Sequence, residues 1–106
     1  FQCKIENGLA KISDMQINLN NSLNIQDACI GVRPDDILIS DQGEYSSSAN
    51  LVEYLGSDMI IYSSVGGQEF SCKLSSKIDL KAGDNFKFNI SPSVLHIFDN
   101  TSGQRV

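Results

Sequence analysis

Hydrophobic and polar side chains alternate through almost all of this 106-residue chain, and this period of two constrains its fold most. Successive side chains of a strand point to opposite faces, so alternation predicts strands with one buried face. The pattern opens at Phe1 to Glu6 and returns clearly at Phe86 to Ile90. No stretch sustains the i, i+3, i+4, i+7 spacing of an amphipathic helix. The sequence therefore predicts an all-β protein.

Turn-forming residues separate the alternating runs. Asn7-Gly8 and Gly66-Gly67 predict tight hairpin turns, and Lys81 to Asp84 predicts a further turn. Pro34 ends another run because proline cannot donate to a strand ladder. About nine or ten short strands at such spacing favour an antiparallel barrel or sandwich. Besides the runs at residues 1–6 and 86–90, we expect strands at residues 9–12, 15–19, 23–26, 28–32, 49–55, 59–65, 69–74 and 94–98.

The segment from Asp41 to Asn50 is the least patterned part of the chain. It contains Ser46-Ser47-Ser48, three polar residues in a row. Such a run is typical either of a flexible loop or of a polar edge strand. Both interpretations stay open from the sequence.

Length and charge limit the possible functions. A chain of this size forms one domain with a self-sufficient core. Thirteen acidic and eight basic residues give a net charge of −5, which opposes binding to nucleic acid or to an anionic membrane. No run approaches the roughly 20 apolar residues of a membrane-spanning helix. The composition thus predicts a soluble, acidic domain. Because it starts at Phe1, within an alternating run and without a signal peptide, we expect a piece of a longer polypeptide.

The three cysteines, Cys3, Cys29 and Cys72, lie far apart and form no C-x-x-C pair. Disulfide-stapled secreted domains usually have a denser, even set. We therefore expect three small, half-buried hydrophobic side chains in a reducing compartment. A structural zinc site is not expected, since the single histidine, His96, has no cysteine near it in the sequence.

Motifs of nucleotide and hydrolytic chemistry are absent from the sequence. It contains no Gly-Lys dipeptide for a phosphate-binding loop, no dinucleotide fingerprint and no G-x-S-x-G elbow. His96 is the one histidine that could activate a nucleophile. Because it falls inside the expected strand 94–98, we interpret it as a half-covered strand residue rather than as a catalytic base. Asp35 and Asp36 are adjacent and indicate a solvated turn. We predict no catalytic, cofactor-binding or metal-binding residue.

Glu53 stands among apolar neighbours in the expected strand 49–55. A buried carboxylate without a partner is costly, so it should meet a cation or backbone amides. Arg33 is the partner we expect. The role predicted for this pair is structural rather than catalytic.

Three segments, in their order and spacing, resemble a known family. They read IGVRPDDI at residues 30–37, LVEYLGSDMIIY at 51–62 and LHIFDNTSGQR at 95–105. Together they resemble the C-terminal regulatory domain of sugar-importer ABC ATPases of the maltose and glycerol-3-phosphate group. The family shows G-[IV]-R-P-E/D, V-V-E-x-L-G-x-E/D and L-H-L-F-D-x-x-T/S-G-x-R. The matching positions that we take as structural or interaction candidates are Arg33, Pro34, Asp35, Glu53, Gly56, His96, Phe98, Asp99 and Gly103.

The resemblance implies a transport-associated, OB-like (TOBE-type) β-barrel of short antiparallel strands with an extra amino-terminal hairpin region. It implies one domain over residues 1–106, with leading hairpin strands at 1–27 and the motif-bearing barrel at 28–106, as a fragment of a longer ATPase. The chain departs from the family at Ser46-Ser47-Ser48, where the strand is usually more apolar.

The same resemblance implies a regulatory and dimerisation role, without enzymatic activity in this fragment. ATP and Mg²⁺ would belong to the nucleotide-binding domain, and the fragment itself would hold no cofactor. The implied partners are its own nucleotide-binding domain, a second copy of the ATPase subunit and the membrane permease subunits. The implied location is cytoplasmic, at the inner face of the cell membrane.

Two other functions share this fold. One is a small-oxyanion sensor in a related importer ATPase of the molybdate, iron or polyamine type, with Ser46 to Ser48 or Gly66-Gly67 as ligands. The excess of acidic over basic residues argues against a strong anion site. The other is an oligonucleotide-binding domain, which needs a basic groove and stacking aromatic side chains. The net charge of −5 and the absence of tryptophan argue against it.

Overall fold

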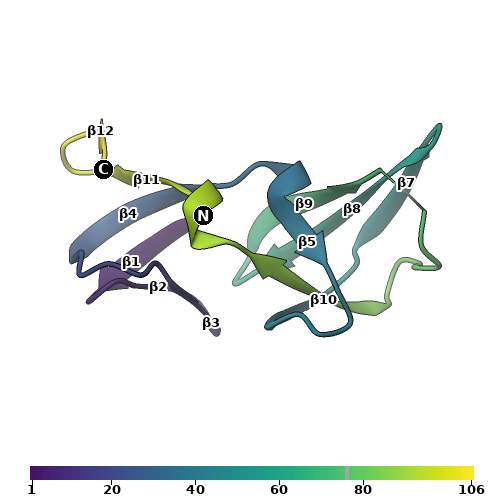
Figure 1. The fold of residues 1–106 in the computed structure, drawn as a ribbon, viewed down its shortest axis with the longest axis horizontal. Helices are drawn as coiled ribbons and strands as arrows, with labels where there is room; N and C mark the ends of the chain where they lie inside the picture. The colour runs from purple at the N-terminus through teal and green to yellow at the C-terminus, as the bar shows by residue number, and fades with distance from the viewer. Residues whose placement is uncertain (76) are drawn as a thin grey trace. The chain divides into compact units, whose positions relative to one another are not determined.

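The computed structural model describes residues 1–75 and 77–106, which form short antiparallel strands (Figure 1). The described residues contain no α-helix, and none of their helical turns has the length and apolarity needed to cross a bilayer. The predicted all-β class is confirmed. The elements are β1 Gln2–Glu6, β2 Leu9–Ile12, β3 Met15–Asn18, β4 Ile25–Gly31, η1 Pro34–Asp36, β5 Ile37–Ile39, β6 Tyr45–Ser48, β7 Leu51–Leu55, β8 Asp58–Val65, β9 Gln68–Leu74, β10 Asn85–Ile90, η2 Pro92–Val94, β11 His96–Asp99 and β12 Gln104–Arg105.

Internal contacts divide the chain into two compact units. The first joins Phe1–Val32 to Ser91–Val106, and the second is Arg33–Ile90. This division does not follow the expected ranges 1–27 and 28–106. A single domain with those two parts stays a prediction.

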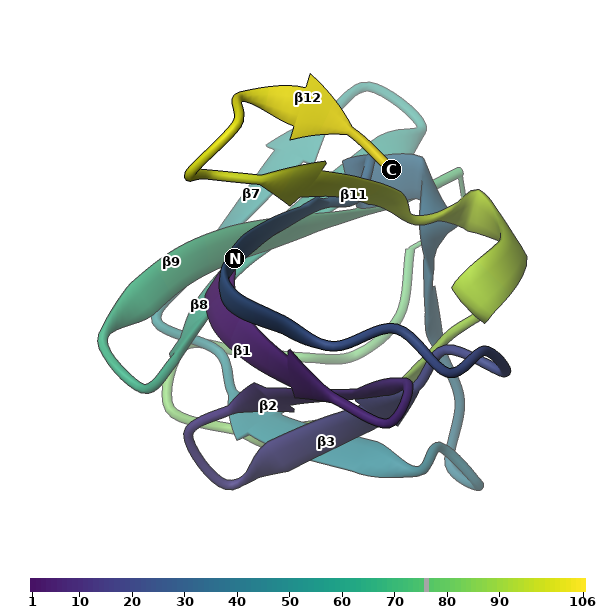
Figure 2. The ribbon, with the colours of Figure 1, turned by 90° about the vertical axis from the view of Figure 1, so that its left-hand side faces the viewer.

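The first unit is one six-stranded sheet in the order β12-β11-β4-β1-β2-β3. Figure 2 shows how this sheet curves from β11 through β1 to β3. A shift in register between Cys3 and Ile5, where β1 pairs with β4, adds a local irregularity of the kind that bends a strand. The expected amino-terminal hairpins are present as β1–β2 and β2–β3. The buried hydrophobic side chains of this unit are Ile5, Ala10, Ile12, Met15, Ile17, Leu19, Ala28 and Ile30.

Gly8 fixes the first hairpin, as the Asn7-Gly8 pair predicts. Both residues have positive φ, 47° at Asn7 and 75° at Gly8, which suits a tight two-residue turn. The Gly8 N–H donates to the Leu23 carbonyl at 2.9 Å, and the Leu19 N–H donates to the Gly8 carbonyl at 2.8 Å. A Cβ at Gly8 would overlap the backbone carbonyl of Asn21. The turn is therefore held between two later segments that leave no room for a side chain.

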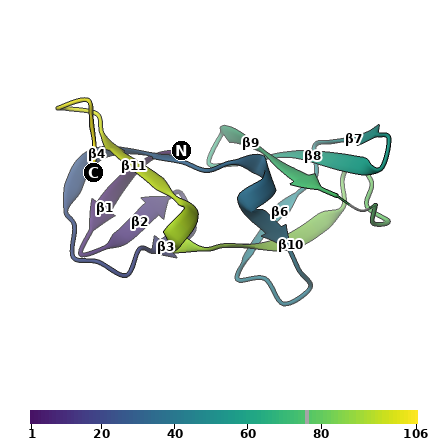
Figure 3. The same ribbon diagram turned by 45° about the horizontal axis from the view of Figure 1, so that its top comes forward.

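The second unit consists of two three-stranded sheets, β5-β10-β6 and β7-β8-β9 (Figure 3). Phe88 on β10 is 1% exposed and lies at the centre of an aromatic cluster. Its ring centroid is 5.6 Å from that of Tyr45, 5.5 Å from Phe70 and 5.7 Å from Phe86. These rings come from β6, β9 and β10, so the cluster joins both sheets. The buried hydrophobic side chains are Ile37, Ala49, Met59, Ile61, Cys72, Leu80, Phe86, Phe88 and Ile90.

The chain turns from one sheet into the other at Ala49-Asn50. The Ala49 N–H donates to the Asp84 carbonyl at 2.9 Å, whereas the Asn50 N–H donates to the Tyr62 carbonyl on β8 at 2.7 Å. Odd-numbered side chains point inward along β6 as far as the buried Ala49. Along β7 the even-numbered side chains point inward, beginning with Val52, which pairs with the buried Ile61. Asn50 is therefore one extra residue inserted into the alternation. The predicted strand 49–55 is present only from Leu51.

The backbone ladders of the described residues leave three open sheets rather than one closed barrel. Two further boundaries differ from the expected ones. The expected strands 23–26 and 28–32 form the single strand β4, because its register against β1 runs through both. The last expected strand begins at His96, since Pro92–Val94 forms a 3₁₀ turn.

The three cysteines are free, as expected. Cys3 and Cys29 are half-buried, and Cys72 is buried between the sheets of the second unit. Burial raises the pKa of the Cys72 thiol to about 12, because desolvation penalises the thiolate. Cys72 is thus a small core side chain rather than a reactive one.

We predict that Gly8→Ala destabilises the protein far more than Gly67→Ala. Both glycines are the second residue of a two-residue hairpin turn with φ near +75° and +78°, so both substitutions cost about 1–2 kcal/mol of backbone strain. Only at Gly8 does the added Cβ meet backbone, which adds about 1–3 kcal/mol of overpacking. Urea unfolding of the two variants measures the difference. Equal losses in the free energy of unfolding would show that the loop carrying Asn21 can move away from the added Cβ at no cost.

Candidate functional site

The motif residues predicted from the sequence are divided between the two units. Arg33, Pro34 and Asp35 are exposed around the 3₁₀ turn η1, where Pro34 takes a helix-starting position that needs no backbone donor. Asp35 and Asp36 belong to this turn, in agreement with a turn interpretation. Gly56, with φ of 61°, lies in the hairpin turn between β7 and β8. These residues shape turns at the surface of the second unit.

Four further motif residues, His96, Phe98, Asp99 and Gly103, lie in the β11–β12 hairpin of the first unit. His96 is half-buried and pairs with Gly31 of β4, and Phe98 is 37% exposed. The Asp99 carboxylate accepts the Thr101 N–H at 2.9 Å. The Asp99 carbonyl accepts the N–H of Gly103, which has a φ of 73°. The final motif therefore encodes a turn whose acid and glycine satisfy its backbone.

The predicted pairing of Glu53 with Arg33 is wrong. No ion pair joins the two side chains within the described ranges, and Glu53 is half-buried rather than buried. Glu53 lies on the edge strand β7, directly opposite Ile60 of β8. Water reaches this carboxylate, so it needs no buried cation.

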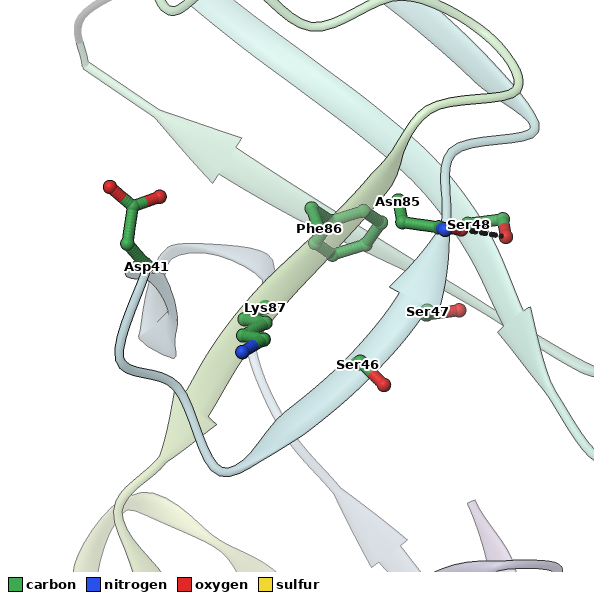
Figure 4. A pocket seen from close by; sticks show the side chains of 7 residues that line it. All are labelled: Asp41, Ser46, Ser47, Ser48, Asn85, Phe86 and Lys87. Carbon is green, nitrogen blue, oxygen red and sulfur yellow. Dashed lines mark hydrogen bonds between the residues drawn. The ribbon is translucent and has the colours of Figure 1, made fainter.

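An open hollow lies beside β6 and β10 in the second unit. It has a volume of about 580 Å³ and is lined by Asp41, Ser46, Ser47, Ser48, Asn85, Phe86 and Lys87 (Figure 4). The strand register places Ser48 opposite Asn85 and Ser46 opposite Lys87. The Ser48 hydroxyl donates to the Asn85 side-chain oxygen at 2.8 Å. We call this site the β6–β10 hollow.

The β6–β10 hollow and the hollow next to it together carry more negative than positive charge. Lys87 supplies one ammonium group, and Asp41 supplies a carboxylate that points away from it in Figure 4. An adjoining hollow of about 740 Å³ shares both residues and adds Asp79 and Asp84. The carboxylate of Asp84 accepts the Lys81 N–H at 2.9 Å, so it closes the predicted turn 81–84. Three carboxylates beside one ammonium oppose the binding of an anion.

A polar contact that we call the serine seam joins β6 to β8. It consists of the Ser47 and Ser63 hydroxyls and the carbonyls of Ser48 and Ser64. The two hydroxyl oxygens are 2.6 Å apart, and Ser63 donates to the Ser48 carbonyl at 2.6 Å. The single Ser47 proton is shared between the Ser63 oxygen and the Ser64 carbonyl, which lies 3.1 Å away. Ser63 is 1% exposed, so its hydroxyl is satisfied within the protein.

The serine seam resolves the two interpretations of Ser46-Ser47-Ser48. The segment is an edge strand of the sheet β5-β10-β6, as one of them held. Ser47 faces the interior, where β6 meets β8 through hydroxyl groups instead of a backbone ladder. Ser63 was not among the residues predicted to contact this segment. The signal available was Ser63-Ser64, a polar pair inside the apolar run 59–65.

Catalytic chemistry finds little support in this arrangement. Within residues 1–75 and 77–106, no group of three or more His, Cys, Asp or Glu side chains could hold a metal ion. Tyr45 borders the serine-rich strand, and its pKa is raised by burial and, to a lesser degree, by the neighbouring Glu44 carboxylate. The phenol therefore stays protonated as part of the aromatic cluster. The geometry fits a structural or interaction role.

Comparison with known proteins places these features in a family. Residues 30–98 match the TOBE domain family. The chain is 35% identical over 82 residues to the sn-glycerol-3-phosphate import ATP-binding protein UgpC of Cupriavidus pinatubonensis, covering 76% of this chain and 22% of that protein. It is 27% identical over 122 residues to the oligosaccharides import ATP-binding protein MsmX of Bacillus subtilis, covering 100% of this chain and 33% of that protein. The chain thus spans between about a fifth and a third of these relatives' lengths.

We predict that Ser63→Ala lowers the free energy of unfolding by about 1–3 kcal/mol, because the Ser48 carbonyl loses its buried donor. Ser46→Ala is the control: Ser46 is exposed on β6, next to Ser47 of the serine seam, and its substitution should change stability by less than about 0.5 kcal/mol. Thermal and urea unfolding measure both effects. Unchanged stability in Ser63→Ala would mean that the serine seam does not hold the sheets together.

Proposed function

The chain belongs to the TOBE domain family, and we propose that it is the C-terminal regulatory and dimerisation domain of the ATP-binding subunit of an ABC importer. The solutes of such an importer would be sugars or glycerol-3-phosphate-like compounds. The observation that carries this proposal is the match over residues 30–98, together with relatives named as import ATP-binding proteins. The spacing of the three sequence motifs supports the same assignment.

The architecture of the second unit suits a structural role beside a moving ATPase. Its aromatic cluster and serine seam fix two sheets against each other without a ligand. The sequence has no phosphate-binding loop. We therefore assign ATP and Mg²⁺ binding to a separate nucleotide-binding domain of a longer chain, and no catalytic step to these residues.

The partners follow from this assignment. They are the chain's own nucleotide-binding domain, a second copy of the ATPase subunit and, through the parent protein, the membrane permease subunits. Nucleic acid is not among them, because the net charge is −5. The parent would act at the cytoplasmic face of the membrane.

The oxyanion-sensor alternative receives less support from the described side chains. Of the three serines, Ser47 and Ser48 use their hydroxyls in internal hydrogen bonds. Gly66-Gly67 forms an exposed turn in which a Cβ on Gly67 would meet no atom within 4 Å. A cradle for an anion needs several groups converging on one point, and neither segment supplies them.

The first test of the proposal is the reading frame upstream of Phe1. We expect it to encode a Walker A loop and an ABC signature motif, because an importer ATPase needs both for ATP hydrolysis. Sequencing the natural gene is the measurement. A reading frame that starts near Phe1 would reject the assignment.

The second test separates the regulatory domain from the oxyanion sensor. Isothermal calorimetry of the 106-residue chain with molybdate, tungstate and sulfate should show no binding at micromolar concentrations, because the two adjoining hollows together hold three carboxylates and one ammonium group. Sodium chloride at equal ionic strength is the control for non-specific heat. Micromolar affinity for one of the three oxyanions would favour the sensor.

A further inference from the structure

Asn7-Gly8 is the one Asn-Gly pair in the sequence, and Asn-Gly is the dipeptide most prone to lose its side-chain amide. In this reaction the backbone nitrogen of the glycine attacks the side-chain carbonyl carbon of the asparagine. Glycine allows the attack because it has no Cβ to obstruct the approach. The Asn7 side chain is exposed and borders an open hollow of about 320 Å³, so the amide itself is accessible. Any protection must therefore come from the glycine.

Three hydrogen bonds hold this glycine and its turn against the chain that follows β3. The Gly8 N–H donates to the Leu23 carbonyl at 2.9 Å, and Gly8 is buried although Asn7 is exposed. The Leu19 N–H donates to the Gly8 carbonyl at 2.8 Å. The Asn7 N–H donates to the Asn24 side-chain oxygen at 3.0 Å. We call these three hydrogen bonds the clasp.

The clasp opposes the attack in two ways. The glycine nitrogen must lose its proton to become a nucleophile, and an amide proton held in a buried hydrogen bond is removed only when the structure opens locally. The backbone must also rotate to bring the Gly8 nitrogen to the Asn7 side chain. Because the Gly8 N–H and C=O groups are both bonded, the turn keeps its φ values of 47° and 75° while the clasp is closed.

We propose that Asn7 is a deamidation site that the clasp protects, so that it reacts only when residues 19–24 open from the turn. The Gly8 nitrogen then bonds to the Asn7 side-chain carbonyl carbon, and its proton passes through water to the departing amide, which leaves as ammonia. Water adds to one of the two carbonyl carbons of the resulting succinimide ring and breaks its bond to the glycine nitrogen. Addition at the side-chain carbon gives aspartate, and addition at the main-chain carbon gives isoaspartate.

Isoaspartate at this position prevents the clasp from forming again. It lengthens the main chain before Gly8 by one methylene group, which displaces the glycine. Gly8 has no space for such a shift, because even a Cβ there would overlap the Asn21 backbone carbonyl. The close contact that protects Asn7 while the clasp is closed thus makes the effect of the modification permanent. The site therefore records how often residues 19–24 have opened.

Mass spectrometry of the 106-residue chain, incubated at mildly alkaline pH, measures the rate of deamidation at Asn7. The same chain in guanidinium chloride gives the rate without a clasp. We expect the folded chain to react at least tenfold more slowly than the unfolded one, because the reaction has to wait for local opening. Equal rates in the folded and the unfolded chain would overturn the proposal.

Asn24→Ala tests the clasp itself, because it removes the acceptor of the Asn7 N–H at an exposed position. It should raise the Asn7 rate in the folded chain about threefold or more. Asn100→Ala is the matched control: Asn100 is also exposed in the first unit, and its amide bonds Gln2 and Asp27 rather than the turn. It should leave the Asn7 rate unchanged. An unchanged rate in Asn24→Ala, or an equal rise in both variants, would overturn protection by the clasp.

Thermal melting tests the permanence of the effect. Chains that carry isoaspartate at position 7, separated after reaction in guanidinium chloride and refolded, should melt several degrees below wild type, and their Gly8 amide should exchange hydrogen faster. Asn7→Asp is the matched control, because it adds the same charge without lengthening the main chain, and aspartate tolerates positive φ. Equal melting of the isoaspartate and Asn7→Asp chains would show that the clasp re-forms and would overturn this step. Neither result depends on the importer assignment.

Discussion

The Phe88 ring lies 5.5–5.7 Å from three other aromatic rings, and these come from both sheets of residues 33–90. Each such pair contributes about 0.5–1.5 kcal/mol beyond its burial, and burying one aromatic side chain contributes about 1.5–3 kcal/mol. Because the two sheets share no complete backbone ladder in the described residues, this cluster supplies much of the force that holds them together. Phe86, one ring of this cluster, also lines the β6–β10 hollow.

The serine seam complements this cluster at the strand where apolar packing ends. Hydroxyl groups replace a ladder between β6 and β8, and the buried Ser63 carries two of the contacts. A satisfied buried hydroxyl adds specificity, because any sliding of β6 along β8 would leave both polar partners unpaired. The seam therefore fixes which residues of the two strands face each other.

The alternation of side chains predicted most strands and the tight turns at Asn7-Gly8 and Gly66-Gly67, since these depend on neighbouring residues alone. It could not predict where Ser47 finds its partner, because β6 and β8 are joined by side chains from distant parts of the chain. Glu53 was misassigned for a related reason. Its apolar neighbours in sequence alternate between faces, and only the register with Ile60 shows that the carboxylate points to the rim of an exposed face. The motif residues indicated the family, but their spacing carried no information about surfaces.

Asn50, the residue that breaks the alternation between β6 and β7, lies where the chain passes from the sheet β5-β10-β6 to the sheet β7-β8-β9. Deleting Asn50 would restore one continuous alternation of inward and outward positions through β6 and β7. Every side chain of both strands would then keep its present face. The deletion would also remove the Asn50 N–H that donates to the Tyr62 carbonyl of β8. The length of this corner, rather than the identity of the residues in it, is therefore what an insertion or deletion would disturb most.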